Sequence, residues 1–324
     1  MPLHIEPVPP EVAAETRAFN DRLEALLATI PAAHTVPPAV VRAGRRLGKG
    51  TFPAPVFLPE MRDLDIAARN GPLRLRVADP PGPPRGVYLH LHGGGWMLGA
   101  ADMQDPDLVA LAAATGLVAA SVDYRLAPEH PFPAGPDDCE DAARWLVEHG
   151  PAALGAPPVF AIGGESAGAH LAVLTLLRLR DRGDLARRFC AANLVYGAYD
   201  LSLSPSQRLW GERNLVLSRP LIDYFGGSFA PGLSLEQRRA PEISPLFADL
   251  RGLVPALFTV GTLDPLLDDT LFMETRWLAA GNRAELRIWP DAVHGFNGFP
   301  TALARLADAA MHEYLARMLP PPGA

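Results

Sequence analysis

Ser166 lies at the centre of Gly164-Glu-Ser-Ala-Gly168, a Gly-x-Ser-x-Gly pattern whose chemistry is nucleophilic attack on an acyl carbonyl. An apolar strand pattern precedes it and a helical pattern follows it. A sharp turn between two such elements holds a serine hydroxyl out above the edge of a sheet, and the flanking residues must be small to avoid clashes. An ordinary tight turn is the alternative, but the strand before and the helix after favour a nucleophile.

Three consecutive glycines follow another apolar strand, in the sequence His92-Gly-Gly-Gly-Trp96. Consecutive glycines let backbone N–H groups converge on one point, which suits an oxyanion hole, a site for the negative oxygen of a tetrahedral intermediate. The predicted donors are the N–H groups of Gly93 and Gly94, with that of Ala167 after the serine. A flexible glycine loop is the alternative, although such a loop is rarely wedged between a strand and a tryptophan. We interpret His92 as a structural residue that packs the loop.

Asp264 and His294 each come just after a predicted strand, so their side chains are expected at the same sheet edge as Ser166. A histidine beside the serine would act as the general base, and an aspartate would orient that histidine. Taken singly, an aspartate after a strand is usually a helix cap and a lone histidine is usually structural. Asp268, one helical turn further on, competes with Asp264 for the role of the acid, and we favour Asp264 because it stands at the strand end.

Six short apolar runs are typical of buried strands, and helical patterns separate most of them. This alternation predicts an α/β fold, with a mostly parallel sheet that is covered by helices on both faces. The predicted strands are residues 87–91, 117–122, 159–162, 191–195, 256–260 and 284–288. The predicted helices are residues 105–115, 137–149, 167–181, 270–280 and 301–318.

Two other regions depart from this alternation. Apolar residues recur at helical spacing over residues 11–30, and a second short helix is predicted over 38–47. An antiparallel hairpin, residues 61–68 and 73–78 around an Asn-Gly turn, then leads into the sheet. Residues 199–243 break the rhythm with Ser-, Pro- and Arg-rich turns, which predicts an insertion over the carboxyl edge, where open α/β sheets bind ligands.

The bulk composition argues against several classes of protein. The chain has 324 residues, 48% of them hydrophobic, so it is long enough to bury a core without stabilisation by disulfides or metals. A formal net charge of −7 with scattered basic residues argues against a nucleic-acid binder. No run reaches the roughly 18 apolar residues of a membrane span and the N-terminus has no secretory signal, so a cytoplasmic location is predicted. Cys139 and Cys190 have no metal-type spacing and are predicted to be reduced, buried thiols.

These features together resemble the hormone-sensitive-lipase-like branch of the α/β-hydrolases, the bacterial short-chain esterases. The resemblance runs from Val87 to Phe296 and rests on five segments of this sequence. Four of them are short: HGGGW, GESAG, DPLLD and HGF. The fifth, DYRLAPEHPFPA over residues 123–134, is the most specific, because chance cannot plausibly supply twelve residues.

The resemblance implies an α/β-hydrolase fold with a helical cap over the acyl pocket. Residues 1–55 would form the N-terminal helical cap region and residues 56–324 the catalytic domain, with a further cap insertion at 199–243. Residues 123–134 would pack near the glycine loop as a structural element. Some relatives pair through the last strand and the final helix, so a homodimer is the implied assembly.

The activity that the resemblance implies is that of a serine carboxylesterase acting on small-molecule esters with short to medium acyl chains. An acyl-enzyme intermediate would form on Ser166, and neither a metal nor an organic cofactor is implied. The candidate walls of the substrate pocket are aromatic or long apolar side chains near the motifs, each of which could equally be plain core. They are Trp96, Met97, Tyr196, Phe225 and Phe229.

Two departures from the family keep alternatives open. The family elbow usually carries Asp or Thr before the serine, whereas this chain carries Glu165, as the larger and disulfide-bonded type-B carboxylesterases do. The first 60 residues match no motif of the family. A non-catalytic receptor on the same scaffold is the main alternative function, although plant gibberellin receptors have lost the histidine that His294 supplies here. An amidase, a lactonase or an acyltransferase could use the same three side chains.

Overall fold

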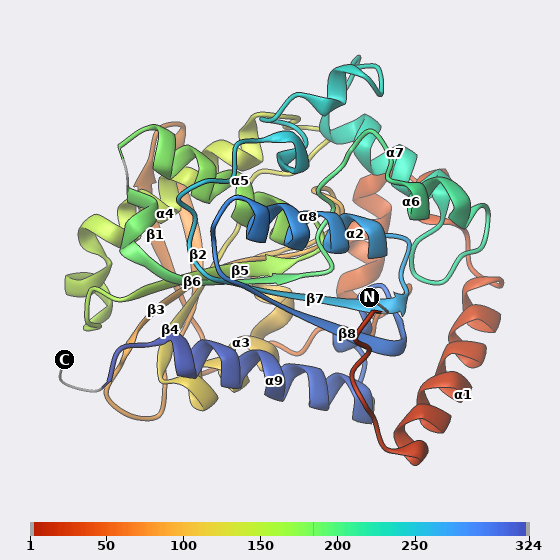
Figure 1. Ribbon diagram of the computed structural model, residues 1–324, viewed down its shortest axis with the longest axis horizontal. Coiled ribbons are helices and arrows are strands. Elements are labelled where there is room, and N and C mark those ends of the chain that lie inside the picture. The colour runs from red at the N-terminus through yellow and green to blue at the C-terminus, as the bar shows by residue number, and fades with distance from the viewer. Residues whose placement is uncertain (1–2, 184, 322–324) are drawn as a thin grey trace.

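A computed structural model describes residues 3–183 and 185–321 and contains one eight-stranded sheet, in the order β1-β2-β4-β3-β5-β6-β7-β8 (Figure 1). β1 and β2 form the predicted hairpin, and β2 also pairs antiparallel with β4. All the other strand pairings of this sheet are parallel. The strands are β1 Arg62–Ala68, β2 Gly71–Ala78, β3 Gly86–Leu91, β4 Leu117–Val122, β5 Phe160–Glu165, β6 Phe189–Val195, β7 Ala256–Leu263 and β8 Ala284–Val293.

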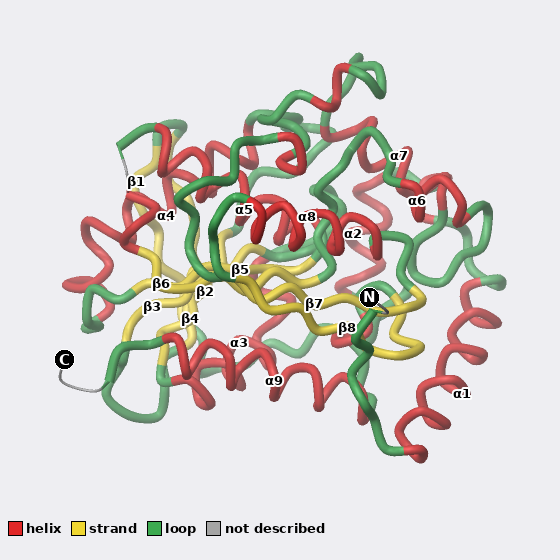
Figure 2. Tube along the Cα trace, in the orientation of Figure 1, coloured by secondary structure: helices red, strands yellow, loops and turns green. Residues whose placement is uncertain are grey.

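Helices cover both faces of the sheet, as the alternation predicted (Figures 1 and 2). Helices α4 (Ala134–Leu154), α5 (Ala167–Asp181) and α8 (Leu267–Ala279) lie on one face. Helices α3 (Asp105–Thr115) and α9 (Ala302–Met318) lie on the other. Every residue of β3 and β4 is buried, which is the pattern of parallel strands enclosed on both sides.

Two apolar cores result, one on each face. Side chains alternate along a strand, so Val87 and Leu89 of β3 join the core under α4 and α5, whereas Tyr88 joins the core under α3 and α9. The fully buried Trp277 of α8 belongs to the first core, and its indole N–H donates to the Val254 carbonyl at 2.9 Å. The sheet is thereby fixed as a rigid base for the residues at its carboxyl ends.

Some predicted elements have different bounds in the structure. β7 and β8 extend beyond their apolar runs because they pair with each other as far as Leu263 and Val293. α8 begins three residues earlier than predicted, with Asp268 and Asp269 in its first turn, where acidic side chains favour a helix N-terminus.

The N-terminal region folds as two helices that are tied to the catalytic edge of the molecule. α1 (Pro10–Leu27) packs beside β8 and α9, and α2 (Pro38–Arg46) lies beside the glycine loop and the segment after β4. The anchor of α2 is Arg42, whose guanidinium donates to the carbonyl oxygens of Met97 (2.6 Å) and Ala127 (2.7 Å) and forms an ion pair with Glu129 (2.8 Å).

The insertion at 199–243 carries α6 (Pro205–Trp210) and α7 (Arg219–Phe229). Its first turn is anchored to α8 by the fully buried carboxylate of Asp269. That carboxylate accepts the N–H groups of Tyr199 (2.7 Å) and Asp200 (2.8 Å) and hydrogen bonds from two further side chains, Ser204 and Gln207. This hydrogen-bond network fixes the insertion relative to the sheet, because without the Asp269 carboxylate the buried donors would have no acceptor.

The N-terminal residues also reach the outer edge of β8. The N–H of Glu6 donates to the Ile288 carbonyl at 2.8 Å, and the Glu6 carboxylate pairs with Arg287 at 3.1 Å. The N-terminal segment of the same chain therefore covers part of the free edge of β8. Dimerisation through this strand and α9 stays a prediction.

Two expectations from composition can be compared with the described residues. Cys139 is a free, buried thiol as predicted, whereas Cys190 is only half-buried because it lies near the start of β6. Among the described helices, none combines the length and the apolar character that a bilayer span requires.

Candidate active site

Ser166 stands between the last residue of β5 and the first residue of α5. Its backbone has φ 56° and ψ −116°, a strained conformation for a residue with a side chain, and strain of this kind concentrates at functional sites. Only glycine fits at the two glycine positions of the motif. A Cβ on Gly164 or on Gly168 would lie about 2 Å from the Leu91 carbonyl oxygen (2.1 and 1.8 Å). The turn predicted from the sequence is thus the turn observed.

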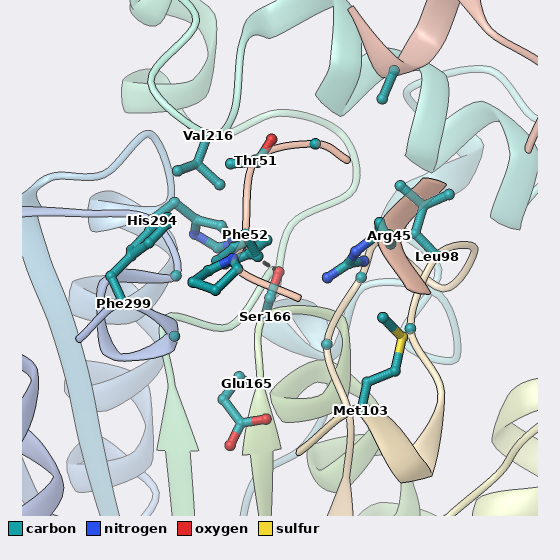
Figure 3. Close-up of a pocket in the computed structure, with 18 of the residues that line it drawn as sticks. Arg45, Thr51, Phe52, Leu98, Met103, Glu165, Ser166, Val216, His294 and Phe299 are labelled. Carbon is teal, nitrogen blue, oxygen red and sulfur yellow. Dashed lines mark hydrogen bonds between the residues drawn. The ribbon is translucent and has the colours of Figure 1, made fainter. Parts of the chain in front are cut away.

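His294 and Asp264 reach Ser166 from two later strand ends, as predicted. His294 follows β8 and Asp264 follows β7. A distance of 2.8 Å separates His294 Nε2 from Ser166 Oγ, and Nδ1 of the same ring lies 2.9 Å from Asp264 Oδ2 (Figure 3). His294 and Asp264 are 4% and 2% exposed, so this chain of hydrogen bonds is shielded from bulk water.

Asp268, the competing candidate for the acid, lies elsewhere. It sits in the first turn of α8, and its carboxylate accepts the Ser206 N–H at 2.8 Å. The Asp264 carboxylate instead accepts the Leu266 N–H at 2.8 Å as well as the bond from His294. Of the two aspartates, Asp264 is the one that the structure brings to the histidine.

The glycine loop lies directly beside the serine. A Cβ on Gly93 would be 3.7 Å from the Ser166 Cβ, and the N–H groups of Gly93 and Gly94 have no hydrogen-bond partner within the described residues. Gly94 has φ +115°, and a Cβ there would lie 2.5 Å from the Gly99 nitrogen, so only glycine fits. Ala167 follows the serine as the first residue of α5, where helix N–H groups point outward.

His92 packs this loop, as predicted. Its ring stacks on Tyr124 with centroids 4.1 Å apart, and the Tyr124 hydroxyl donates to the His92 carbonyl at 2.8 Å. Burial lowers the pKa of His92 to about 3, so the ring is neutral at physiological pH. Tyr124 belongs to the twelve-residue run of 123–134, which therefore supports the loop.

Glu165, the departure from the usual elbow, forms a network with residues from two other segments. Its carboxylate accepts hydrogen bonds from His90 Nε2 (3.0 Å) and from the Gln104 amide (3.3 Å), while His90 Nδ1 meets the Ser121 hydroxyl at 2.8 Å. Desolvation by burial tends to raise the pKa of Glu165, but the neighbouring His90 outweighs it and the pKa lies below its ordinary value. The Glu165 carboxylate thereby acts as a hydrogen-bond acceptor for His90 and Gln104.

Replacing Glu165 by alanine should lower the free energy of unfolding by about 1–3 kcal/mol, because the buried Nε2–H of His90 would lose its acceptor. Glu165→Gln, which keeps an acceptor oxygen, should lose less. Urea denaturation of the three proteins measures the difference. Equal stability of the alanine variant and the unmodified protein would show that this network contributes nothing to the fold.

A cavity of about 980 Å³ opens above Ser166 and His294 (Figure 3). Its walls come from the N-terminal region, the insertion and the segment after β8. A smaller recess of about 40 Å³ also borders Ser166 and is lined by Trp96, Phe225 and Leu217. Ser166 therefore lines two spaces of different size.

Some of the residues predicted to form the pocket walls line one of these two spaces, and others lie in the core. Tyr196 lines the large cavity, Phe225 lines both spaces, and Trp96 lines the recess while stacking on Phe229 at 4.6 Å. Met97 requires a correction, because its side chain is fully buried in the core and lines neither space. The residue after Trp96 turns inward, away from the site.

Several residues of the cavity wall could not be recognised from the sequence. Phe52 and Phe299 stack with centroids 4.9 Å apart, and Arg45 of α2 directs its guanidinium into the cavity. Asp107 and Asp308 form an acidic side of the wall, where desolvation raises the pKa of Asp107 to about 6 and that of Asp308 to about 7. None of these side chains belongs to a motif, so only the fold could bring them together.

The strand-to-helix turn at Ser166 and the sheet behind it define the class: the chain is an α/β hydrolase. The sequence profile of the α/β hydrolase fold family matches residues 88–298. The carboxylesterase NlhH of Mycobacterium tuberculosis is 35% identical over 294 residues, which cover 89% of this chain and 91% of that protein.

Solved structures agree with this assignment. The hyperthermophilic esterase of the archaeon Pyrobaculum calidifontis has a TM-score of 0.83 at 30% identity, over 97% of this chain and 99% of its own. A hormone-sensitive lipase from a metagenome library has a TM-score of 0.81 at 26% identity, over 94% and 98% of the two chains. The chain belongs to the hormone-sensitive-lipase-like esterase family of the α/β hydrolases and is a serine carboxylesterase.

Proposed function

We propose that this enzyme hydrolyses small-molecule esters of short to medium acyl chain length, with Ser166 as the nucleophile, His294 as the general base and Asp264 as the acid that orients the histidine. The observation that carries the proposal is the unbroken series of hydrogen bonds from Ser166 Oγ through the His294 ring to Asp264, at the floor of a cavity of about 980 Å³.

In this mechanism His294 Nε2 takes the hydroxyl proton as Ser166 Oγ attacks the ester carbonyl carbon. The N–H groups of Gly93, Gly94 and Ala167 stabilise the resulting oxyanion. His294 then gives the proton to the leaving alcohol oxygen as the C–O bond breaks, which leaves an acyl group on the serine. Water, deprotonated by the same histidine, releases the acid.

We also propose that residues 1–55 and the insertion at 199–243 act as the cap that shapes the substrate site. Their contribution to the cavity wall supports this, since Val41, Phe52, Val216 and Leu221 all line the cavity. The apolar character of these walls suits an acyl chain. Each buried methylene contributes about 0.8 kcal/mol, or roughly a fourfold gain in kcat/KM.

The experiment is a series of 4-nitrophenyl esters with acyl chains from acetyl to palmitoyl. We expect kcat/KM to rise over the first members and to fall for the longest chains, which would outgrow the cavity. A matched 4-nitroanilide serves as the control for amidase activity and should react far more slowly. Binding of the esters without turnover, and no labelling by a fluorophosphonate, would instead identify a receptor.

A further inference from the structure

Arg45 is the one arginine of α2 whose side chain has no hydrogen-bonding partner among the described residues. Its neighbours on the same helix are both satisfied, Arg42 by two carbonyl oxygens and Glu129, and Arg46 by the Asp102 carboxylate at 3.0 Å. The Arg45 guanidinium packs over the Phe52 ring, with 5.4 Å between its carbon and the ring centroid.

The Arg45 guanidinium is directed into the cavity rather than toward bulk solvent. In Figure 3 it lies on the other side of Ser166 from His294. Arg45 is half-buried, and desolvation lowers its pKa to about 10, so the group is still charged at neutral pH. A guanidinium has five N–H donors, and enclosing them without an acceptor is costly.

The carboxylates of the cavity do not neutralise this charge. Asp107, Asp308 and Glu165 form a separate group, close enough together that they raise the pKa of Asp308. No ion pair joins Arg45 to a carboxylate within residues 3–183 and 185–321. Two other cations, Lys49 and Arg305, also line the cavity, but both are exposed to water. Of the three, Arg45 is the least exposed, and no carboxylate among the described residues pairs with it.

We propose that Arg45 binds a carboxylate group of the substrate, so that the enzyme prefers esters that carry a carboxylate on their acyl or alcohol part. The proposal rests on the proposed function and names the substrate class within it. The planar fork of an arginine matches the two oxygens of a carboxylate, and such a charge-assisted pair is stronger than a neutral hydrogen bond. The substrate would supply the acceptor that the protein does not.

The test compares two matched pairs of esters. In the acyl arm, mono-4-nitrophenyl glutarate is compared with 4-nitrophenyl pentanoate, in which a methyl group replaces the carboxylate. In the alcohol arm, 2-carboxyethyl butyrate is compared with propyl butyrate by titration of the released acid. The readout is the selectivity ratio, kcat/KM for the anionic ester divided by kcat/KM for the neutral ester.

Arg45→Met should lower the selectivity ratio by roughly 10- to 100-fold in the arm that places its carboxylate at the guanidinium. The neutral esters should change little. Arg46→Met removes the same charge from the next residue, which does not line the cavity, and should leave both ratios unchanged. Arg45→Lys should retain part of the ratio, because the charge remains but the fork is lost.

The proposal would be overturned by selectivity ratios that Arg45→Met leaves unchanged in both arms, whether kcat/KM stays the same or falls equally for neutral and anionic esters. If Arg45→Met fails to fold, competitive inhibition of the unmodified enzyme replaces it, and glutarate must inhibit far better than pentanoate, which lacks the second carboxylate. If the unmodified enzyme hydrolyses none of the four esters, the proposed function fails as well. If the enzyme hydrolyses the neutral esters but Arg45→Met leaves the selectivity ratio unchanged, the esterase function stands and only the role of Arg45 is rejected.

Discussion

Ser166→Ala should reduce kcat for 4-nitrophenyl butyrate by roughly 10⁵- to 10⁶-fold and leave the fold intact. The variant removes only the oxygen that lies 2.8 Å from His294 Nε2, and no acyl-enzyme can then form. The N–H groups of Gly93, Gly94 and Ala167 remain, so a residual acceleration of about 10³–10⁴ over the uncatalysed reaction is expected. Release of 4-nitrophenolate measures the rate, and thermal unfolding checks the fold.

The matched control is Ser234→Ala, which removes the hydroxyl of an exposed loop serine that does not line the cavity. Both the control and the unmodified enzyme should react with a fluorophosphonate, and Ser166→Ala should not. Near-native turnover by Ser166→Ala would reject Ser166 as the nucleophile, whatever the labelling shows.

The fold and the positions of the three polar side chains followed from the sequence because both depend on local patterns. Short apolar runs alternating with helical patterns predicted the sheet, and residues directly after parallel strands meet at one edge of it. Ser166, Asp264 and His294 each follow such a strand. The glycines beside them could be predicted because the close approach of Gly164 and Gly168 to Leu91 excludes any side chain.

The cavity wall could not be predicted, because it depends on contacts between residues far apart in the sequence. Arg45 reaches the cavity only because Arg42 ties α2 to carbonyl oxygens 55 and 85 residues away. The pairing of Glu165 with His90 likewise depends on β3 lying next to β5. Met97, a candidate wall that could equally be core, directly follows Trp96 in the sequence, but proximity in sequence does not determine which way the backbone turns after Trp96 (φ 60°).

Asp264→Asn should lower kcat by about 10⁴-fold, whereas Asp268→Asn should change it only a few-fold. Ionised Asp264 can only accept, so it fixes the His294 proton on Nδ1 and leaves Nε2 free to receive the proton of Ser166. An asparagine can instead donate to Nδ1. The proton would then sit on Nε2, and the histidine could no longer act as the base.

The two substitutions are matched, because each replaces one oxygen of a carboxylate by an amide nitrogen in the same segment. Asp268 accepts the Ser206 N–H, a bond that the asparagine oxygen can still make, and it makes no contact with His294. Rates with 4-nitrophenyl butyrate, together with urea denaturation of both variants, separate a catalytic loss from a folding defect. A collapse of kcat in Asp268→Asn with Asp264→Asn near normal would move the acid to the helix and contradict the reasoning from strand ends.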